Sequence, residues 1–517
     1  MKKLPVGIQT FSELIENEYL YVDKTRHIHG LFADGGKYYF LSRPRRFGKS
    51  LLISTLSELF SGNKELFKDL WIYDKTEWPA HPVIHIDFTN IEYENSELLK
   101  QSLVETLDAI AADHGLQLTS VSYKTRFGEL IKKMSGGETG KVVILVDEYD
   151  KPITDQIEKK ETAEANRNIL ANFYGVIKGT DKYLKFVFLT GVSKFSKVSV
   201  FSGLNNLRDI TLSEEFSTLL GYTQDELPRY FDAHISNLAE KMGEEKNRLL
   251  DKIKEWYNGY SWDGNNFVYN PFSILNLFNE KSFDNYWFST GTPTFLLKLI
   301  KQQPYVLPEL EQWPVSSYAF DSYDIAHVDI VPLLFQTGYL TIKQITIKED
   351  TNRYRLDYPN REVRDSFLVY LLQEFTRRNK MFGIQIRDRI NGALEKDDIA
   401  GFFEEMKTLF ASIPYQIFIG KKEAYYHTVV YLVLKLAGAQ ISAEDSTNIG
   451  RMDAVLETGK KIYIMEFKMG SEHDALNQVK EKKYHEKYRG RGKDIVLVGI
   501  GFDEEKKNIA GYVLESA

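Results

Sequence analysis

Residues 38–60 read YYFLSRPRRFGKSLLISTLSELF, and this stretch decides the fold of the N-terminal part of the chain. The run from Tyr38 to Leu41 is short and apolar, as expected for a strand, and the apolar residues after Ser50 recur at helical spacing. Between them lies RPRRFGKS, residues 43–50. A strand, a loop and a helix in this order surround an anion with backbone N–H groups and a helix N-terminus. The stretch therefore predicts a phosphate-binding loop in an α/β domain with a parallel sheet.

The loop follows the Walker A pattern G-x-x-x-x-G-K-[ST] except at its first position, where Arg43 replaces glycine. We expect Lys49 to reach the terminal phosphates of a nucleotide and Ser50 to ligate Mg²⁺. Because Arg43 is not glycine, it must avoid a positive φ. The alternative is a basic turn at a helix start that binds nothing. The other loop residues expected to contact the nucleotide are Arg45, Arg46, Phe47, Gly48 and Leu51.

A second apolar run, from Val142 to Val146, ends in the carboxylates Asp147 and Glu148. Such a continuous run is typical of a strand buried on both faces of a parallel sheet. It lies about a hundred residues after the loop, which favours a Walker B interpretation over a chance acidic pair. We expect Asp147 to hold a hydrated Mg²⁺ ion and Glu148 to polarise the attacking water.

Two further strands are predicted in the same domain. Residues 184–191 end in Thr190, where a residue that senses the γ-phosphate would lie, although Thr190 and Gly191 can equally terminate the strand. Residues 83–88 carry Asp87 near their end, and we favour a turn-initiating role for this carboxylate over a nucleotide contact.

Four segments together resemble the bacterial AAA-ATPase-like family: Tyr21–Thr25, the loop 43–50, Val146–Asp150 and Thr190–Phe195. The resemblance spans essentially the whole chain, and Arg43 resembles the family's own loop. It implies a P-loop domain that binds ATP, and a PD-(D/E)XK nuclease domain at the C-terminal end. ATP binding is implied by this resemblance, whereas hydrolysis is a separate question.

The C-terminal part has its own set of polar residues. Residues 423–434 are predicted to form a helix, and residues 450–456 and 461–468 a hairpin across the turn 457–460. The two-residue period of a strand places Glu466 and Lys468 on one face, where Asp453 of the neighbouring strand can share a metal with Glu466.

The residue types of Asp453, Glu466 and Lys468 suit the cleavage of a phosphodiester bond. Two carboxylates can hold Mg²⁺, which stabilises developing negative charge and lowers the pKa of a bound water. We expect Lys468 to orient or deprotonate that water, with Glu423 and Gln478 in support. The ordered set resembles the PD-(D/E)XK nuclease pattern. An inactive descendant of the same fold is the alternative.

The basic run of residues 478–493 holds seven Lys or Arg against two Glu. Such a run suits contacts with nucleic-acid phosphates, and a solvated helix is its alternative. The predicted domains are residues 1–215, with the phosphate-binding loop; 216–400, a helical lid with a possible winged-helix-like hairpin; and 401–517, a restriction-endonuclease-like α/β domain. Residues 257–260 are interpreted as turn residues within the lid.

Composition narrows the class of protein. At 517 residues the chain is long enough for two or three domains, and its net charge of −7 argues against a generally basic nucleic-acid-coating protein. The absence of cysteine excludes disulfides and thiolate zinc sites. No apolar run suggests a signal peptide or a membrane span, so we expect a cytoplasmic protein with no membrane partner.

Together these patterns predict an α/β protein in which ATP binding or hydrolysis gates or drives a Mg²⁺-dependent nuclease. We expect nucleic acid as its partner, DNA rather than RNA, and consider homo-oligomerisation possible. The alternatives are a nucleotide-sensing or nucleic-acid-binding protein with an inactive nuclease fold, and an ATPase that remodels other proteins.

Overall fold

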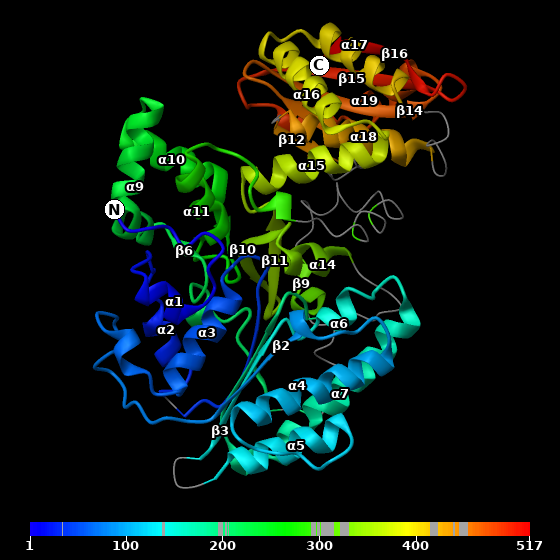
Figure 1. The fold of residues 1–517 in the computed structure, drawn as a ribbon. Coiled ribbons are helices and arrows are strands. Elements are labelled where there is room, and N and C mark those ends of the chain that lie inside the picture. The colour runs from blue at the N-terminus through cyan, green and yellow to red at the C-terminus, as the bar shows by residue number, and fades with distance from the viewer. Residues whose placement is uncertain are drawn as a thin grey trace. The chain divides into compact units, whose positions relative to one another are not determined.

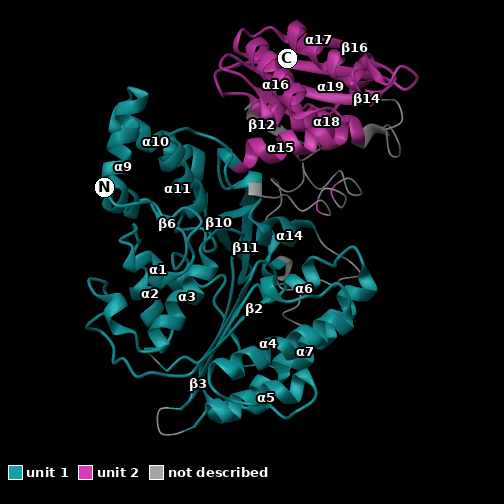
Figure 2. Cartoon of the chain, viewed as in Figure 1, with its two compact units in different colours: residues 1–290, 314–362 teal, residues 291–313, 363–517 magenta. Residues whose placement is uncertain are grey.

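The structure is a computed structural model, and it describes most of the chain. The described residues are 1–33, 35–136, 140–194, 200–201, 204, 206–290, 296, 300, 315–320, 330–413, 422–437, 440–443 and 453–517, without the side chains of 290, 318–319, 422–424, 427 and 440–443. The chain divides into two compact units (Figure 2). The N-terminal unit comprises Met1–Thr290 and Pro314–Glu362, and the C-terminal unit comprises Gly291–Trp313 and Val363–Ala517.

A five-stranded parallel sheet forms the centre of the N-terminal unit (Figure 1). The strand order is β2-β3-β4-β1-β5, so β4 lies between the strand that precedes the phosphate loop and the strand that ends in Asp147. The strands are β1 (Tyr38–Ser42), β2 (Val83–Asp87), β3 (Val142–Asp147), β4 (Leu184–Gly191) and β5 (Arg208–Asp209). The four strands predicted from apolar runs are therefore confirmed.

Helices cover both faces of this sheet, which explains why its strands are apolar throughout. In β1, Tyr38 and Phe40 belong to one hydrophobic core and Tyr39 and Leu41 to the other. The first core is closed by α4 (Ser96–Asp113), α5 (Tyr123–Met134) and α7 (Lys160–Gly179). The second is closed by α1 (Phe11–Glu16), α2 (Thr25–Gly30) and α3 (Lys49–Phe60).

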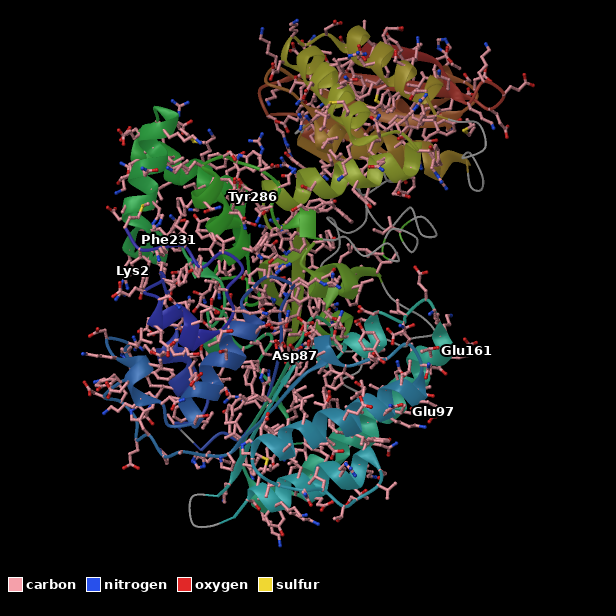
Figure 3. The ribbon with its side chains drawn as sticks, viewed as in Figure 1. Lys2, Asp87, Glu97, Glu161, Phe231 and Tyr286 are labelled. Atoms are coloured by element: carbon pink, nitrogen blue, oxygen red, sulfur yellow. The ribbon has the colours of Figure 1, made fainter. Side chains whose placement is uncertain are left out.

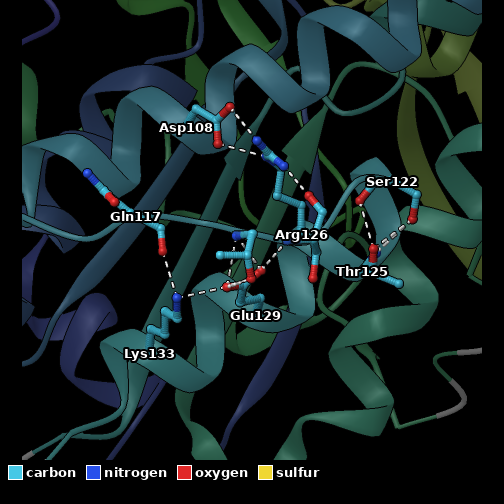
Figure 4. A network of polar contacts seen from close by, with 9 residues as sticks. Asp108, Gln117, Ser122, Thr125, Arg126, Glu129 and Lys133 are labelled. Atoms are coloured by element: carbon cyan, nitrogen blue, oxygen red, sulfur yellow. Dashed lines mark hydrogen bonds and ion pairs between the residues drawn. The ribbon is translucent and has the colours of Figure 1, made fainter.

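A surface network of polar contacts joins α4 to α5 (Figure 4). The Arg126 guanidinium donates to both carboxylate oxygens of Asp108, at 2.7 and 2.9 Å. Glu129 accepts hydrogen bonds from the backbone of Thr119 and Ser120 and pairs with Lys133 at 2.8 Å, so the pKa of its carboxyl is held well below the usual range. These contacts fix the connection between the two helices.

The rest of the N-terminal unit is helical with two small antiparallel sheets. Helices α9 (Glu226–Met242), α10 (Lys246–Tyr257) and α11 (Pro271–Glu280) share one core. The first small sheet has the order β6-β8-β7, with β6 (Tyr222–Thr223), β7 (Asn258–Tyr260) and β8 (Val268–Tyr269). The turn interpretation of residues 257–260 is therefore wrong, because pairing with β8 extends this segment into a strand.

The predicted hairpin in the middle of the chain is confirmed. Strands β10 (Thr341–Lys348) and β11 (Thr351–Asp357) pair in antiparallel fashion, and β9 (Val315–Ser316) adds to β11. The hairpin follows α14 (Ile330–Thr337) and precedes α15 (Arg361–Thr376). The winged-helix-like comparison stays a prediction.

The C-terminal unit is built on a mixed five-stranded sheet of order β12-β13-β14-β15-β16. The strands are β12 (Gln440–Ala443), β13 (Ala454–Glu457), β14 (Lys461–Met469), β15 (Asp494–Asp503) and β16 (Asn508–Ser516). Strands β14 and β15 are parallel, joined through α19 (Glu472–Glu481), and the other neighbours are antiparallel. Helices α16 (Lys380–Glu395), α17 (Ile399–Ala411) and α18 (Lys422–Leu436) precede the sheet. Among the described helices, none is both long and apolar enough to cross a membrane.

Candidate functional site

The phosphate loop runs from the end of β1 at Ser42 to the start of α3 at Lys49. Two of its residues have left-handed backbone conformations, Arg46 with φ 65° and Gly48 with φ 90°. Arg43 is outside the left-handed region, as expected for a residue that replaces glycine. The strain of a non-glycine residue in the loop therefore lies at Arg46.

Arg43 is a buried structural residue with 1% of its surface exposed. Its guanidinium donates hydrogen bonds to the carbonyls of Ser42 and Thr211, both at 2.9 Å, and to that of Phe216 at 3.3 Å. The guanidinium carbon lies 3.8 Å from the centre of the Trp262 ring, a cation–π distance. Burial lowers the pKa of this guanidinium to about 9, so it still carries a charge at neutral pH. Arg43 thus anchors the base of the loop.

The residues expected to bind phosphate and metal lie close together at the end of β3. The ammonium of Lys49 lies 3.2 Å from a carboxylate oxygen of Glu148 and 3.4 Å from the carbonyl of Pro44. The side chain of Ser50 acts on Asp147 by lowering the pKa of its carboxyl. The structure therefore brings together four of the predicted residues, Lys49, Ser50, Asp147 and Glu148.

The two carboxylates at the end of β3 differ in environment. Burial raises the pKa of Asp147 to about 6, and the neighbouring Glu148 adds to this rise, while Lys49 and Ser50 oppose it. Glu148 is partly exposed and has φ 51°, a strained conformation for a residue with a Cβ. Its backbone N–H donates to Asp147 at 2.9 Å.

Thr190 and Asp87 take part in backbone contacts. The Thr190 hydroxyl is buried and donates to the carbonyl of Leu41 at 2.9 Å, inside the sheet. Asp87, labelled in Figure 3, accepts the backbone N–H of Thr89 at 2.8 Å, which supports the turn-initiating role. In the pairing of β2 with β3, Asp87 lies beside Asp147. A contact of Thr190 with the γ-phosphate stays a prediction, and its hydroxyl is already engaged.

The remaining loop residues lie against a set of aromatic side chains from much later in the sequence. Arg45 is exposed, and its carbonyl accepts the indole N–H of Trp287 at 3.1 Å. Arg46 is exposed as well, with its guanidinium 5.1 Å from the centre of the Phe272 ring. Phe47 is buried against Tyr260 and Trp262, at centroid distances of 4.8 and 5.4 Å, and Leu51 is half-buried in the first turn of α3. The sequence around the loop gives no signal that connects it to these aromatic residues.

In the C-terminal unit, Glu466 and Gln478 are in direct contact. Glu466 lies in β14 with 3% of its surface exposed, and the side-chain amide of Gln478, from α19, donates to its carboxylate. Asp453 lies immediately before β13, and its carboxylate accepts the backbone N–H of Phe467 at 2.7 Å. Lys468 is half-buried, two residues after Glu466 on the same strand. Each carboxylate is thus oriented by an amide.

The alternation of β14 explains which face carries this set. Ile462 and Ile464 pack in the core beneath α19, and Glu466 and Lys468 continue the same row. In β15, Glu466 is paired with Gly499 and Lys468 with Gly501. A Cβ on Gly499 would lie 2.1 Å from the carbonyl oxygen of Glu472, so glycine there allows α19 to approach the strand closely. This close approach brings Gln478 to Glu466.

The oxygen donors fit a hard divalent cation at both places, because Asp147 with Ser50 and Asp453 with Glu466 are the ligand types that Mg²⁺ takes. Glu423 belongs to α18, but its side chain lies outside the described part of the structure, as do residues 450–452. Within the described residues, no group of three or more His, Asp or Glu side chains could enclose a metal. The described C-terminal site therefore supplies two carboxylates.

The basic run of residues 478–493 does not form one helical stripe. Helix α19 ends at Glu481, and Tyr484 and Tyr488 of the following 3₁₀ turn are buried in the core. Lys480 pairs with Glu515 at 2.5 Å, and Lys493 pairs with Glu457 at 2.9 Å. Lys483 and Arg489 are exposed and would be able to meet phosphates.

The fold and the loop geometry define the class of protein: the N-terminal unit is a P-loop-like α/β domain, in a chain that is α/β overall. Residues 5–201 match the family model described as "Predicted AAA-ATPase", and residues 421–511 match that of the PD-(D/E)XK nuclease superfamily. A protein of Azotobacter chroococcum mcd 1, described as "Uncharacterized protein in vnfD 5'region", is 40% identical over 524 residues, covering 100% of this chain and 99% of that protein. The chain belongs to the AAA-ATPase-like family and carries a PD-(D/E)XK nuclease superfamily domain, which confirms the resemblance seen in the sequence.

Proposed function

We propose that the protein binds and hydrolyses ATP in its N-terminal unit, and that this unit controls a Mg²⁺-dependent nuclease in its C-terminal unit. The observation that carries the proposal is the convergence of residues from distant segments. Lys49 and Glu148 are 3.2 Å apart although about a hundred residues separate them, and Gln478 from α19 contacts Glu466 from β14. Chance motifs would not be expected to converge in both units.

At the nucleotide site, each residue has a separate task. Lys49 neutralises phosphate charge, and the loop N–H groups at the start of α3 bind phosphate oxygens. Ser50 and Asp147 would hold Mg²⁺, which supplies charge stabilisation at the phosphates. Glu148 orients the attacking water and accepts its proton. Arg45 and Arg46 are exposed on the loop and can add phosphate contacts.

At the C-terminal site, Asp453 and Glu466 would hold Mg²⁺, which supplies stabilisation of the negative charge that develops on a phosphodiester. Lys468 lies on the same strand face as Glu466 and can orient the attacking water. Gln478 keeps the Glu466 carboxylate in one orientation. Glu423 of α18 would contribute a further carboxylate.

The proposed substrate is nucleic acid, DNA rather than RNA, and the site of action is the cytoplasm, where ATP is available. Exposed basic residues after α19, including Lys483 and Arg489, would contact the phosphate backbone. Binding of this kind weakens steeply as the salt concentration rises. The protein is proposed to work as a homo-oligomer or as a monomer. The proposed domains are residues 1–215, 216–400 and 401–517.

The test is cleavage of single- and double-stranded DNA and RNA by the full chain with Mg²⁺, with and without ATP. Wild type, Lys49→Ala and Asp453→Ala are compared. We expect cleavage that responds to ATP in wild type, that no longer responds in Lys49→Ala, and that disappears in Asp453→Ala. Salt-sensitive binding without any cleavage would instead support a nucleic-acid-binding protein with an inactive nuclease fold. Cleavage that survives in Asp453→Ala would reject the site assignment.

A further inference from the structure

Helix α15 (Arg361–Thr376) begins in the N-terminal unit and continues in the C-terminal unit, because the boundary between the units falls between Glu362 and Val363. We call residues 359–362 the α15 root. Because the root belongs to the N-terminal unit, its contacts show how the helix is attached to the domain that carries the phosphate loop.

Several contacts hold the α15 root. The Pro359 carbonyl accepts a hydrogen bond from the ammonium of Lys343 at 2.8 Å. The same carbonyl lies so close to Gly259 that a Cβ there would be 2.0 Å away. The side-chain amide of Asn360 donates to the carbonyl of Tyr257 at 3.0 Å. The root is therefore fixed against the end of α10 and the strand β7.

The last residue of the root, Glu362, is fully buried and accepts two hydrogen bonds. One comes from the Ser273 hydroxyl at 2.8 Å, and the other from the backbone N–H of Trp287 at 2.6 Å. Burial raises the pKa of Glu362 to about 8. The carboxyl is therefore largely neutral at pH 7 and acts through hydrogen bonds rather than through charge.

The elements that hold the root also hold the phosphate loop. Trp287 contacts Glu362 through its backbone N–H and the Arg45 carbonyl through its indole N–H. In α11, Ser273 bonds to Glu362 while its neighbour Phe272 lies under the Arg46 guanidinium. Strand β7 also contacts both parts, because Gly259 lies against Pro359 of the root and the next residue, Tyr260, packs on Phe47 of the loop.

We infer that Trp287 and Glu362 are positioning residues that couple the phosphate loop to the α15 root, so that nucleotide at the loop alters the dynamics of α15. This inference rests on the proposed ATP binding at the loop. Trp287 carries the most direct connection, since one residue bonds to both partners. Coupling of this kind is reciprocal, so a ligand that changes α15 also changes the affinity of the loop for nucleotide.

Hydrogen exchange of the full chain tests the inference without relying on catalysis. Exchange is measured with and without a non-hydrolysable ATP analogue and Mg²⁺, in wild type, Trp287→Phe and Trp78→Phe. Trp78→Phe is the matched control, because its indole also donates to a backbone carbonyl at 3.1 Å, that of Tyr73. Trp287→Phe removes the indole donor but keeps an aromatic ring and the backbone N–H.

We expect the analogue to slow exchange at residues 43–50 in all three proteins. At residues 361–376 it should change exchange by about twofold or more in wild type and Trp78→Phe, and by much less in Trp287→Phe. Glu362→Gln should keep this response, because the amide retains a carbonyl acceptor, whereas Glu362→Ala should lose it. If Trp287 and Glu362 had only a structural role, their substitution would not remove the response of α15 while keeping nucleotide binding at the loop.

The outcomes distinguish the two proposals. Slower exchange at the loop with no response of α15 in wild type would overturn the coupling and leave ATP binding intact. An undiminished α15 response in both Trp287→Phe and Glu362→Ala would also overturn it. No effect of the analogue on the wild-type loop would instead reject the proposed ATP binding, and the coupling inference would fall with it.

Discussion

The ammonium of Lys49 lies 3.2 Å from the carboxylate of Glu148, and the lysine side chain is only 4% exposed. The cation proposed to bind phosphate is therefore already paired with the proposed general base. A phosphate that binds Lys49 must share this cation with Glu148 or displace the carboxylate.

Replacing Glu148 with Gln removes the anion that competes for Lys49. We expect ATP affinity to rise, by up to about fivefold, since one ion pair contributes about 1 kcal/mol. ATP hydrolysis should fall by about a hundredfold or more, because the amide cannot accept a proton. Equilibrium binding of a labelled ATP and phosphate release measure the two effects. Glu164→Gln, on the exposed face of α7, is the control, and weaker binding by Glu148→Gln would contradict the competition.

Arg43→Gly restores the standard first residue of the loop pattern, yet it should destabilise the protein. The substitution leaves the buried carbonyls of Thr211 and Phe216 without their donor and removes the cation from Trp262. A loss of about 3 kcal/mol is expected, which lowers the melting temperature of the N-terminal unit by roughly 5 °C or more. Calorimetry of the full chain measures this shift. Arg46→Gly, at the left-handed position of the same loop, should leave stability unchanged or slightly higher.

Asp453→Asn should abolish cleavage while preserving the fold. The amide oxygen can still accept the N–H of Phe467, but the negative charge that attracts a divalent cation is lost. We expect nuclease activity to fall by about a hundredfold or more with ATP binding unaffected. Cleavage assays are compared with those of Asp474→Asn, an exposed carboxylate in the first turn of α19. Full activity in Asp453→Asn would exclude this residue from the metal site.

Gly499→Ala should separate α19 from β15. The new methyl group would lie 2.1 Å from the Glu472 carbonyl oxygen and 2.5 Å from the Leu476 nitrogen, so the helix must move. A loss of about 1–3 kcal/mol in the C-terminal unit is expected, together with weaker cleavage as Gln478 leaves Glu466. Gly459→Ala, in the open turn before β14, is the matched control. Equal stability and activity of both variants would show that the close approach is not needed.

The buried Glu362 should make stability depend on pH. Its pKa is about 8 in the folded chain, against 4.5 for an ordinary glutamate, chiefly because of burial. Its stabilising contribution is therefore complete below about pH 4.5 and is lost as the pH rises through about 8. The nearby titratable groups are Asp284, Tyr257, Tyr260 and Tyr286.

Glu362→Gln cannot ionise, so its melting temperature relative to wild type should increase as the pH is raised from about 5 to about 9. The comparison is made across a pH series, with Glu280→Gln on the surface of α11 as the control. A difference between Glu362→Gln and wild type that stays constant over this range would show that Glu362 does not titrate there.

Local pattern was enough to predict the central elements. The strands β1 to β4 were predicted because parallel strands covered on both faces are apolar at every position. The C-terminal hairpin followed from alternation, which also placed Glu466 and Lys468 on one face. Within the described residues, strand β13 begins at Ala454, after Asp453, and residues 450–452 of the predicted strand lie outside them.

Contacts between distant segments could not be predicted in this way. Nothing near Arg43 in the sequence indicates that it is buried against Trp262, or that Trp287 would bond to the loop. The strand at residues 258–260 was missed because Gly259 and its neighbours look like turn residues, and only pairing with β8 extends them. The hydrogen bond from the Thr190 hydroxyl likewise could not be predicted, because its acceptor lies in the partner strand β1.

The burial of Arg43 on Trp262 also has an evolutionary consequence. A mutation of Arg43 to glycine would leave the Trp262 ring without its cation and the carbonyls of Thr211 and Phe216 without their donor. A mutation of Trp262 alone would instead expose the buried guanidinium of Arg43. Each single step lowers stability, so a lineage could exchange this arginine-based loop for a glycine-based one only by changing both positions together. We therefore expect residues 43 and 262 to vary as a pair among related chains.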